Sequence, residues 1–182
     1  MEDDKLIELT RDCEATWIPS GTPVTLKKGE KVMITQSLGG SYTVVINGNM
    51  VRIDGKNADA IGRPVVAVPK AGEADHKGPV EREKVWERMK SCYDPEIPVN
   101  IVDLGLVYDC DIKPIESGGN RVEVKMTLTA PGCGMGDTIR RDVESKIKDV
   151  PGVTEVDVQL VWEPQWNQSM MSEAAKLQLG LL

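Results

Sequence analysis

The chain has 182 residues, a formal net charge of −7 at pH 7, no Phe, four Trp and three Tyr. The acidic balance argues against nucleic acid as the main partner, because phosphate binding requires a basic surface. No apolar run approaches the roughly 18 residues that a membrane span needs, and the acidic N-terminus lacks the apolar core of a signal peptide. We therefore expect a cytoplasmic protein that binds neither nucleic acid nor membrane.

Residues 1–70 have the pattern of a small all-β domain. Asn47-Gly48-Asn49 separates two β-rich runs, and Asn and Gly tolerate the positive φ of a tight hairpin. Short strands with frequent turns predict a small barrel or sandwich. The low aromatic content leaves no stacking platform for single-stranded nucleic acid. The clearest expected strands are 24–26, 32–35, 43–46 and 50–53.

A linker is expected at about residues 69–78, where Pro, Gly and charged residues are mixed. The only histidine of the chain, His76, lies in this stretch. A metal site built from several histidines of one chain is therefore excluded.

From residue 79 to residue 170, the sequence pattern is that of helices and strands in alternation. Apolar residues at Val85, Met89 and Cys92 predict an amphipathic helix, and later alternation of apolar and polar residues predicts strands. The order α-β-β-α-β predicts a two-layer α+β domain, with the helices on one face of a small three-stranded mixed sheet. The expected helices are 80–92 and 135–149, the expected strands are 106–112, 122–128 and 156–162, and residues 171–182 form a tail or short helix.

The four cysteines are spaced too widely for a CxxC pair. Zinc-finger, thioredoxin and self-contained ferredoxin-type cluster sites are therefore not expected. Cys92 and Cys110 fall on apolar periodicities and belong to the expected core. Cys13 lies near a chain end, where it could be exposed.

Cys133 is the candidate functional thiol, because it lies between an expected strand and an expected helix. Gly132 and Gly134 leave it unshielded by neighbouring side chains, and the positive end of a helix dipole favours a thiolate. A cysteine nucleophile normally needs a base such as His within reach, and the only histidine, His76, lies in the expected linker. A soft-metal ligand, in contrast, needs only the thiolate. A buried cysteine in a tight turn is the alternative interpretation.

Two acidic motifs, Asp94-Pro95-Glu96-Ile97-Pro98 and Asp103-Leu104-Gly105-Leu106, precede the first strand of this domain. Their plain interpretation is a helix stop and a turn at the start of a strand. The functional alternative is that their carboxylates converge on Cys133 as hydrogen-bond acceptors or oxygen ligands. In an antiparallel hairpin, the loop before one strand adjoins the loop after the next. Thr129 would supply a hydroxyl at that edge.

The run Trp162-Glu163-Pro164-Gln165-Trp166 follows the last expected strand. Its two tryptophans are either core and covering side chains or anchors for a partner protein, since aromatic side chains near exposed loops bind partners well. The residues leave both interpretations open.

The motifs at 94–98, 103–106 and 129–133, followed by a helix and a strand that leads to 162–166, resemble the SufT/PaaD-type domain of iron–sulfur assembly factors. The resemblance covers about residues 79–170, and residues 1–70 resemble the N-terminal extension of the SufT branch. It implies a non-catalytic role in assembling iron–sulfur clusters or delivering them to apo-proteins in a SUF-type pathway. It also implies that the family's reactive cysteine is Cys133, within a supporting motif of Asp94, Glu96, Asp103, Thr129, Gly132 and Gly134.

On this reading, Cys133 binds iron or a labile iron–sulfur cluster transiently, or exchanges with a partner thiol. One thiol cannot saturate a Cys₄-type cluster. The remaining ligands would come from a second subunit of a homodimer, a client cysteine, carboxylates or a small thiol. No tightly bound cofactor is therefore expected in one chain. The expected partners are iron–sulfur assembly proteins and apo client proteins. Two alternatives are a thiol-dependent carrier enzyme that uses Cys133, and a metal-free scaffold that binds through residues 1–70 and the Trp162–Trp166 edge.

Overall fold

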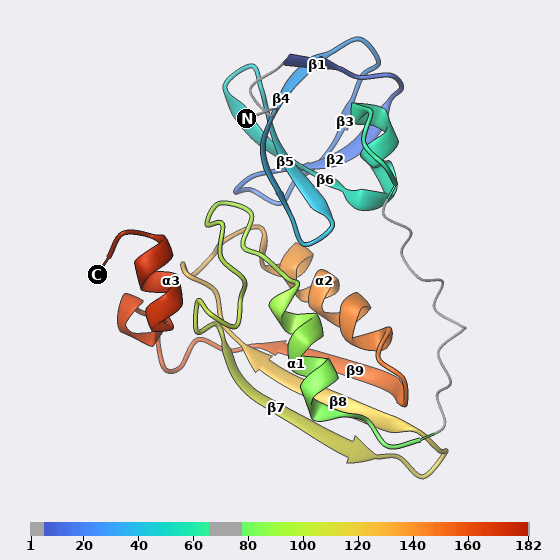
Figure 1. Ribbon diagram of the computed structural model, residues 1–182, viewed down its shortest axis with the longest axis vertical. Helices are drawn as coiled ribbons and strands as arrows, with labels where there is room; N and C mark the ends of the chain where they lie inside the picture. The colour runs from blue at the N-terminus through green and yellow to red at the C-terminus, as the bar shows by residue number, and fades with distance from the viewer. Residues whose placement is uncertain (1–5, 66–77, 182) are drawn as a thin grey trace. The chain divides into compact units, whose positions relative to one another are not determined.

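The computed structural model describes residues 6–65 and 78–181 (Figure 1). These residues form an N-terminal β unit and a C-terminal α+β unit, which we describe separately. Apart from Gly78, the expected linker with His76 lies outside the described residues. Within the described ranges, no helix is long and apolar enough to cross a membrane.

The N-terminal β unit is an antiparallel six-stranded sheet in the order β1-β4-β5-β6-β2-β3. The expected hairpin is confirmed between β5 and β6, where Asn47 (φ 50°) and Gly48 (φ 80°) form a two-residue turn. The elements are β1 (Leu6–Glu8), β2 (Cys13–Trp17), β3 (Pro23–Leu26), β4 (Lys31–Leu38), β5 (Ser41–Ile46), β6 (Asn49–Asp54) and the 3₁₀ helix η1 (Gly55–Ile61).

The core of this unit consists of aliphatic side chains from alternate strand positions, among them Val32, Val44 and Ile53, which are fully buried. The all-β character is confirmed. The pairings place β1 and β3 at the two ends of the sheet, so closure into a barrel is not confirmed. The suggested exposure of Cys13 is wrong: its side chain is buried in this core, and burial raises the pKa of its thiol.

The C-terminal unit has the expected order α-β-β-α-β. Its three-stranded mixed sheet has the order β7-β8-β9, with β7 antiparallel and β9 parallel to β8. Figure 1 shows α1 and α2 side by side on one face of this sheet, which confirms the α+β architecture. The elements are α1 (Arg82–Lys90), β7 (Val107–Pro114), β8 (Asn120–Met126), α2 (Gly136–Lys148), β9 (Val153–Leu160), the 3₁₀ helix η2 (Gln168–Met170) and α3 (Glu173–Gln178).

The core of the C-terminal unit lies between the helices and the sheet. Ile139, Val143 and Ile147 form the buried stripe of α2, which packs against β9. Cys92 and Cys110 are buried, as the sequence predicts. Burial raises the pKa of the Cys110 thiol.

Candidate functional site

Cys133 lies in the turn between β8 and α2, which begins at Gly136. Its thiol is free and half-buried, whereas the other three cysteines are buried. Gly132 and Gly134 beside it are exposed. Gly132 has φ 75°, in the left-handed region that favours glycine, so the turn requires a glycine there. The structure thus places the thiol just before a helix N-terminus.

The acidic loop that begins at Asp94 is closed at its base by backbone pairing. Tyr93 and Asn100 form an isolated antiparallel bridge, and the Asp94 N–H donates to the Val99 carbonyl at 3.4 Å. The Asp94 side chain is only 7% exposed, whereas Glu96 is exposed. The two carboxylates of this motif therefore have different environments.

Asn100 shapes the turn that presents Asp103. Its Oδ1 accepts hydrogen bonds from the N–H groups of Val102 (3.1 Å) and Asp103 (2.9 Å), while its Nδ2 donates to Asp103 Oδ2 at 2.6 Å. Asp103 is half-buried. The carboxylate is therefore held with one oxygen engaged by an amide of its own turn. The sequence analysis missed Asn100, although Asn is a common turn-forming residue because its side chain bonds to backbone N–H groups two and three residues on.

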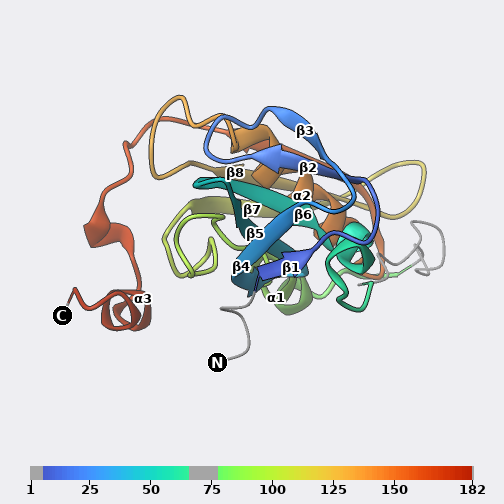
Figure 2. The same cartoon turned by 90° about the horizontal axis from the view of Figure 1, so that it is seen from above.

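The segment after β9 returns to this turn and binds its backbone. The indole N–H of Trp166 donates to the Leu104 carbonyl at 2.8 Å, and the Ser172 N–H donates to the Asp103 carbonyl at 2.8 Å. Figure 2 shows the C-terminal segment, in red, reaching α3 near the loops that precede β7. The C-terminal segment thereby fixes the turn that carries Asp103.

A steric contact and a side-chain hydrogen bond add to this attachment. A Cβ placed on Gly105 would lie 2.2 Å from the Met170 carbonyl oxygen, closer than real atoms approach, and Gly105 has φ 74°. The Tyr108 hydroxyl donates to the Pro164 carbonyl at 2.7 Å. Gly105 is therefore required both by its backbone conformation and by the segment packed on it.

The two tryptophans of the segment have different roles. Trp166 is half-buried and bonded to its own chain. Trp162 is 44% exposed, one of a few large apolar side chains with that much accessible surface among the described residues. The covering interpretation fits Trp166, and the partner-binding interpretation stays a prediction for Trp162.

The ends of the β7–β8 hairpin adjoin one another, as expected. Val107 pairs with Met126, and the Thr127 N–H donates to the Leu106 carbonyl at 2.8 Å. Thr129, two residues further on, is half-buried. Within residues 6–65 and 78–181, no group of three or more His, Cys, Asp or Glu side chains could hold a metal ion. A preformed set of carboxylate ligands around Cys133 is thus not seen there.

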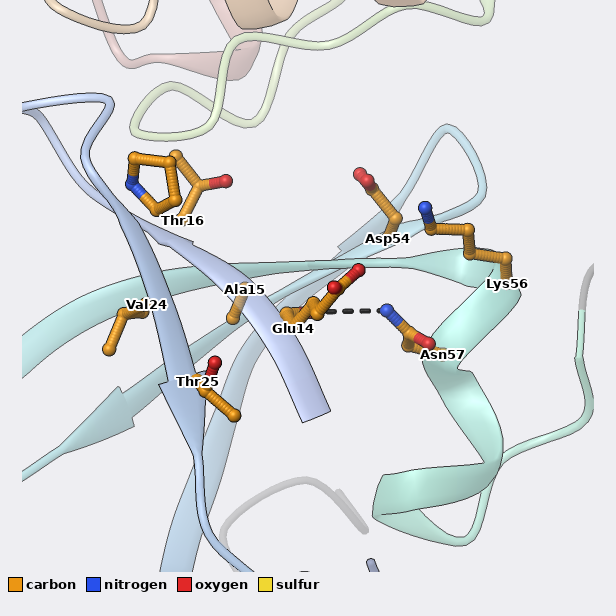
Figure 3. Close-up of a pocket in the computed structure, with 9 residues that line it drawn as sticks. Glu14, Ala15, Thr16, Val24, Thr25, Asp54, Lys56 and Asn57 are labelled. Atoms are coloured by element: carbon orange, nitrogen blue, oxygen red, sulfur yellow. Dashed lines mark hydrogen bonds between the residues drawn. The ribbon is translucent and has the colours of Figure 1, made fainter. Parts of the chain in front are cut away.

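A separate hollow of about 380 Å³ lies on the N-terminal β unit (Figure 3). Asn57 Nδ2 donates to the Glu14 carbonyl at 3.2 Å on one side of it. The lining is Glu14, Ala15, Thr16, Pro23, Val24, Thr25, Asp54, Lys56 and Asn57. The sequence analysis did not single out these residues, because they come from separate elements and form no motif.

Residues 82–158 match a family described as "Iron-sulfur cluster assembly protein". The Fe-S protein maturation auxiliary factor of Porphyromonas gingivalis is 47% identical over 100 residues, which are 55% of this chain and 91% of that protein. The chain belongs to this iron–sulfur cluster assembly family. Bacillus subtilis YitW, another Fe-S protein maturation auxiliary factor, is 38% identical over 55% of this chain and 94% of its own length. Staphylococcus aureus SufT, of the same description, is 40% identical over 48% and 96% respectively.

The matched part of this iron–sulfur assembly protein begins at the first residue of α1 and ends within β9. It contains Cys133 and all the residues of the supporting motif. Trp162, Trp166 and the N-terminal β unit lie outside the residues matched by the family. The C-terminal segment that holds the Asp103 turn lies beyond residue 158, where the family match ends.

Proposed function

We propose that this chain is an accessory factor that helps assemble iron–sulfur clusters or deliver them to apo-proteins, with the Cys133 thiolate as a transient ligand for iron or a labile cluster. The observation that carries the proposal is the half-buried, glycine-flanked thiol of Cys133 within residues 82–158 of the family match. The names of the relatives, maturation auxiliary factors, support an accessory rather than a catalytic role.

Cys133 is the cysteine best suited to this work. Cys13, Cys92 and Cys110 are buried, and burial raises the pKa of the Cys13 and Cys110 thiols. Because iron binds the thiolate and not the thiol, a raised pKa makes those two poor ligands. One accessible thiolate cannot saturate a Cys₄-type cluster. The remaining ligands come from a client cysteine, a second subunit, a small thiol or carboxylates.

Delivery from such a site is a ligand exchange. A client thiol loses its proton, its sulfur forms a bond to iron, and the iron–Cys133 bond breaks. Cys133 takes up a proton as the client thiol gives one up, so neither electrons nor protons are left over. A site with one protein thiolate favours this step, because fewer bonds must break before the cargo leaves.

The supporting motif has a proposed role beside Cys133. The carboxylates of Asp94, Glu96 and Asp103 accept hydrogen bonds from the cargo or from a partner, and the Thr129 hydroxyl can also donate one. Asn100 fixes the orientation of Asp103. Gly132 and Gly134 keep the thiol accessible. Trp162 is the proposed contact for assembly proteins or apo client proteins, since it is exposed just beyond β9.

Cluster transfer tests the function directly. The full chain is loaded with iron and sulfide without oxygen, and then mixed with an apo-ferredoxin whose visible circular dichroism reports cluster arrival. We expect the wild type to transfer cluster and Cys133→Ser to lose most of this transfer. Cys13→Ala, which removes a buried thiol outside the family match, is the matched control and should transfer normally. Equal transfer by Cys133→Ser and the wild type would contradict the role of the thiolate.

A further inference from the structure

The sheet of the C-terminal unit has two edge strands, and β7 is the protected one. Arg82 Nη2 donates to the Cys110 carbonyl of β7 at 2.8 Å. The strand ends at Pro114, which has no N–H to offer a further strand. At the other end, the Tyr108 hydroxyl holds the C-terminal segment. Such features prevent an edge strand from pairing with another chain.

β9, the other edge, is eight residues long and contains no Pro. In the part of the chain that the structure describes, β9 pairs only with β8. From Thr154 to Leu160, its outer backbone groups bond to no described residue. Unpaired N–H and C=O groups along a strand of this length are a template for an added strand.

The two faces of β9 differ in chemistry. On the helix side, Val156 and Leu160 are only half-buried, although their β8 neighbours Val122 and Met126 are fully buried. An added strand would cover these two apolar side chains. On the other face, the side chains of Glu155 and Asp157 are 55% and 37% exposed, and the Arg121 guanidinium of β8 lies 3.8 and 3.6 Å from their carboxylates. One guanidinium faces two carboxylates, so a net negative charge remains at this edge. The edge therefore alternates apolar and acidic positions.

A second copy of this chain is a poor occupant of the edge. Two β9 strands related by a two-fold axis would pair antiparallel. With matching faces and a register near the middle of the strand, Asp157 of one copy would lie opposite Asp157 or Glu155 of the other. Like charges directly opposite are destabilising. The same positions favour a strand that brings basic side chains.

We propose that the β9 edge is a docking surface for an extended segment of a partner protein in which apolar and basic side chains alternate. The segment adds to the sheet as a fourth strand: its backbone pairs with β9, its apolar side chains cover Val156 and Leu160, and its basic side chains face Glu155 and Asp157. This proposal does not depend on the role of Cys133, and its test uses the full chain without iron.

The probe is a fluorescent peptide of alternating Lys and Val, seven residues long. We expect it to bind the full chain in a fluorescence anisotropy titration and to shift the backbone amide resonances of β9 in NMR spectra. A peptide with Glu in place of Lys should bind at least about tenfold more weakly, because the complementary charges become like charges. The Lys peptide with N-methyl groups on alternate amides should lose most of its affinity, since it cannot form the ladder.

Charge-reversal variants locate the surface. Glu155→Lys should weaken binding of the Lys peptide about tenfold. Asp109→Lys is the matched control, because Asp109 lies on the same face at the protected edge, and it should leave affinity within about twofold. Equal losses in both variants, or unchanged binding of the N-methylated peptide, would show general charge attraction and overturn the proposal. A dimer that forms through β9, detected by sedimentation and by β9 amide shifts, would also overturn it.

Discussion

The indole N–H of Trp166 donates to the carbonyl oxygen of Leu104 at 2.8 Å, and the two residues are 62 positions apart in the chain. This hydrogen bond ties the segment after β9 to the turn that carries Asp103. The Ser172 N–H bond to the Asp103 carbonyl ties the same two parts together. The position of the Asp103 turn therefore depends on residues that lie beyond the part matched by the family.

Replacing the indole donor should loosen this turn. Trp166→Phe keeps most of the aromatic surface but leaves the Leu104 carbonyl without its partner, so we expect a loss of about 1 kcal/mol of unfolding free energy. Hydrogen exchange at the amides of the turn should become faster. Denaturant unfolding and exchange mass spectrometry measure both effects. Trp162→Phe, at the exposed tryptophan, is the control and should change neither quantity.

Gly105 should not tolerate a side chain. Gly105→Ala places a methyl group 2.2 Å from the Met170 carbonyl oxygen and at a φ of 74°, so we expect destabilisation of about 2–4 kcal/mol from the strain and the displaced segment. Gly118→Ala separates the two causes, because Gly118 also has a positive φ but has open space where the Cβ would lie. It should cost only about 1 kcal/mol. Equal unfolding free energies for the two variants would show that the Met170 contact does not constrain the turn.

The Arg11–Asp59 pair should make the N-terminal β unit sensitive to acid. Arg11 donates to both Asp59 carboxylate oxygens, at 2.7 and 2.6 Å, and this hydrogen bonding lowers the pKa of Asp59 from its ordinary value. A lowered folded-state pKa gives a contribution to stability that is present above the unfolded pKa and is lost as pH falls through the folded one. In an NMR titration of carboxyl carbons, Arg11→Met should therefore raise the Asp59 midpoint. An unchanged midpoint would mean that Arg11 does not stabilise the carboxylate.

The four cysteines should react with iodoacetamide in a definite order. Cys133 is half-buried, whereas Cys13, Cys92 and Cys110 are buried, and alkylation requires an accessible thiolate. We expect Cys133 to be alkylated at least about tenfold faster than the other three in the folded protein. Peptide mapping by mass spectrometry measures the order, and urea-unfolded protein is the control, in which the rates should converge. Faster labelling of Cys13 would contradict the buried core of the N-terminal β unit.

The C-terminal sheet and its helices were predictable from local patterns. The alternation along β7 and β8 and the stripe of Ile139, Val143 and Ile147 each bury one face, and that burial produces the periodicity. The helix end was less predictable. Cys92 continues the apolar spacing of α1, but the helix ends at Lys90, and the Cys92 N–H donates to the Met89 carbonyl in a tighter turn.

Parts of the N-terminal β unit have sequence patterns that indicate their secondary structure only weakly. β2 buries Cys13 and Ala15, whose small side chains give little contrast with their polar neighbours. η1 looks like a loop because it contains Gly, Asn and Asp, yet it buries Ala58 and Ile61. Such elements form because of tertiary burial and not because of local preference.

The places of Cys133, Asp103 and Thr129 in the fold could be predicted from the sequence, since each lies at the end or the start of an expected element. The attachment of the C-terminal segment could not. Its contacts, Trp166 with Leu104 and Gly105 with Met170, join parts of the chain that no local pattern relates. No local pattern therefore distinguishes Trp166 from Trp162.

The most direct test of the central claim is the ligation of iron by Cys133. The full chain, Cys133→Ser and Cys13→Ala are loaded with ⁵⁷Fe and sulfide without oxygen, and their Mössbauer spectra and iron contents are compared. We predict thiolate-bound iron in the wild type and in Cys13→Ala, and a loss of that spectral component in Cys133→Ser. The same spectrum and iron content in all three proteins would contradict the account.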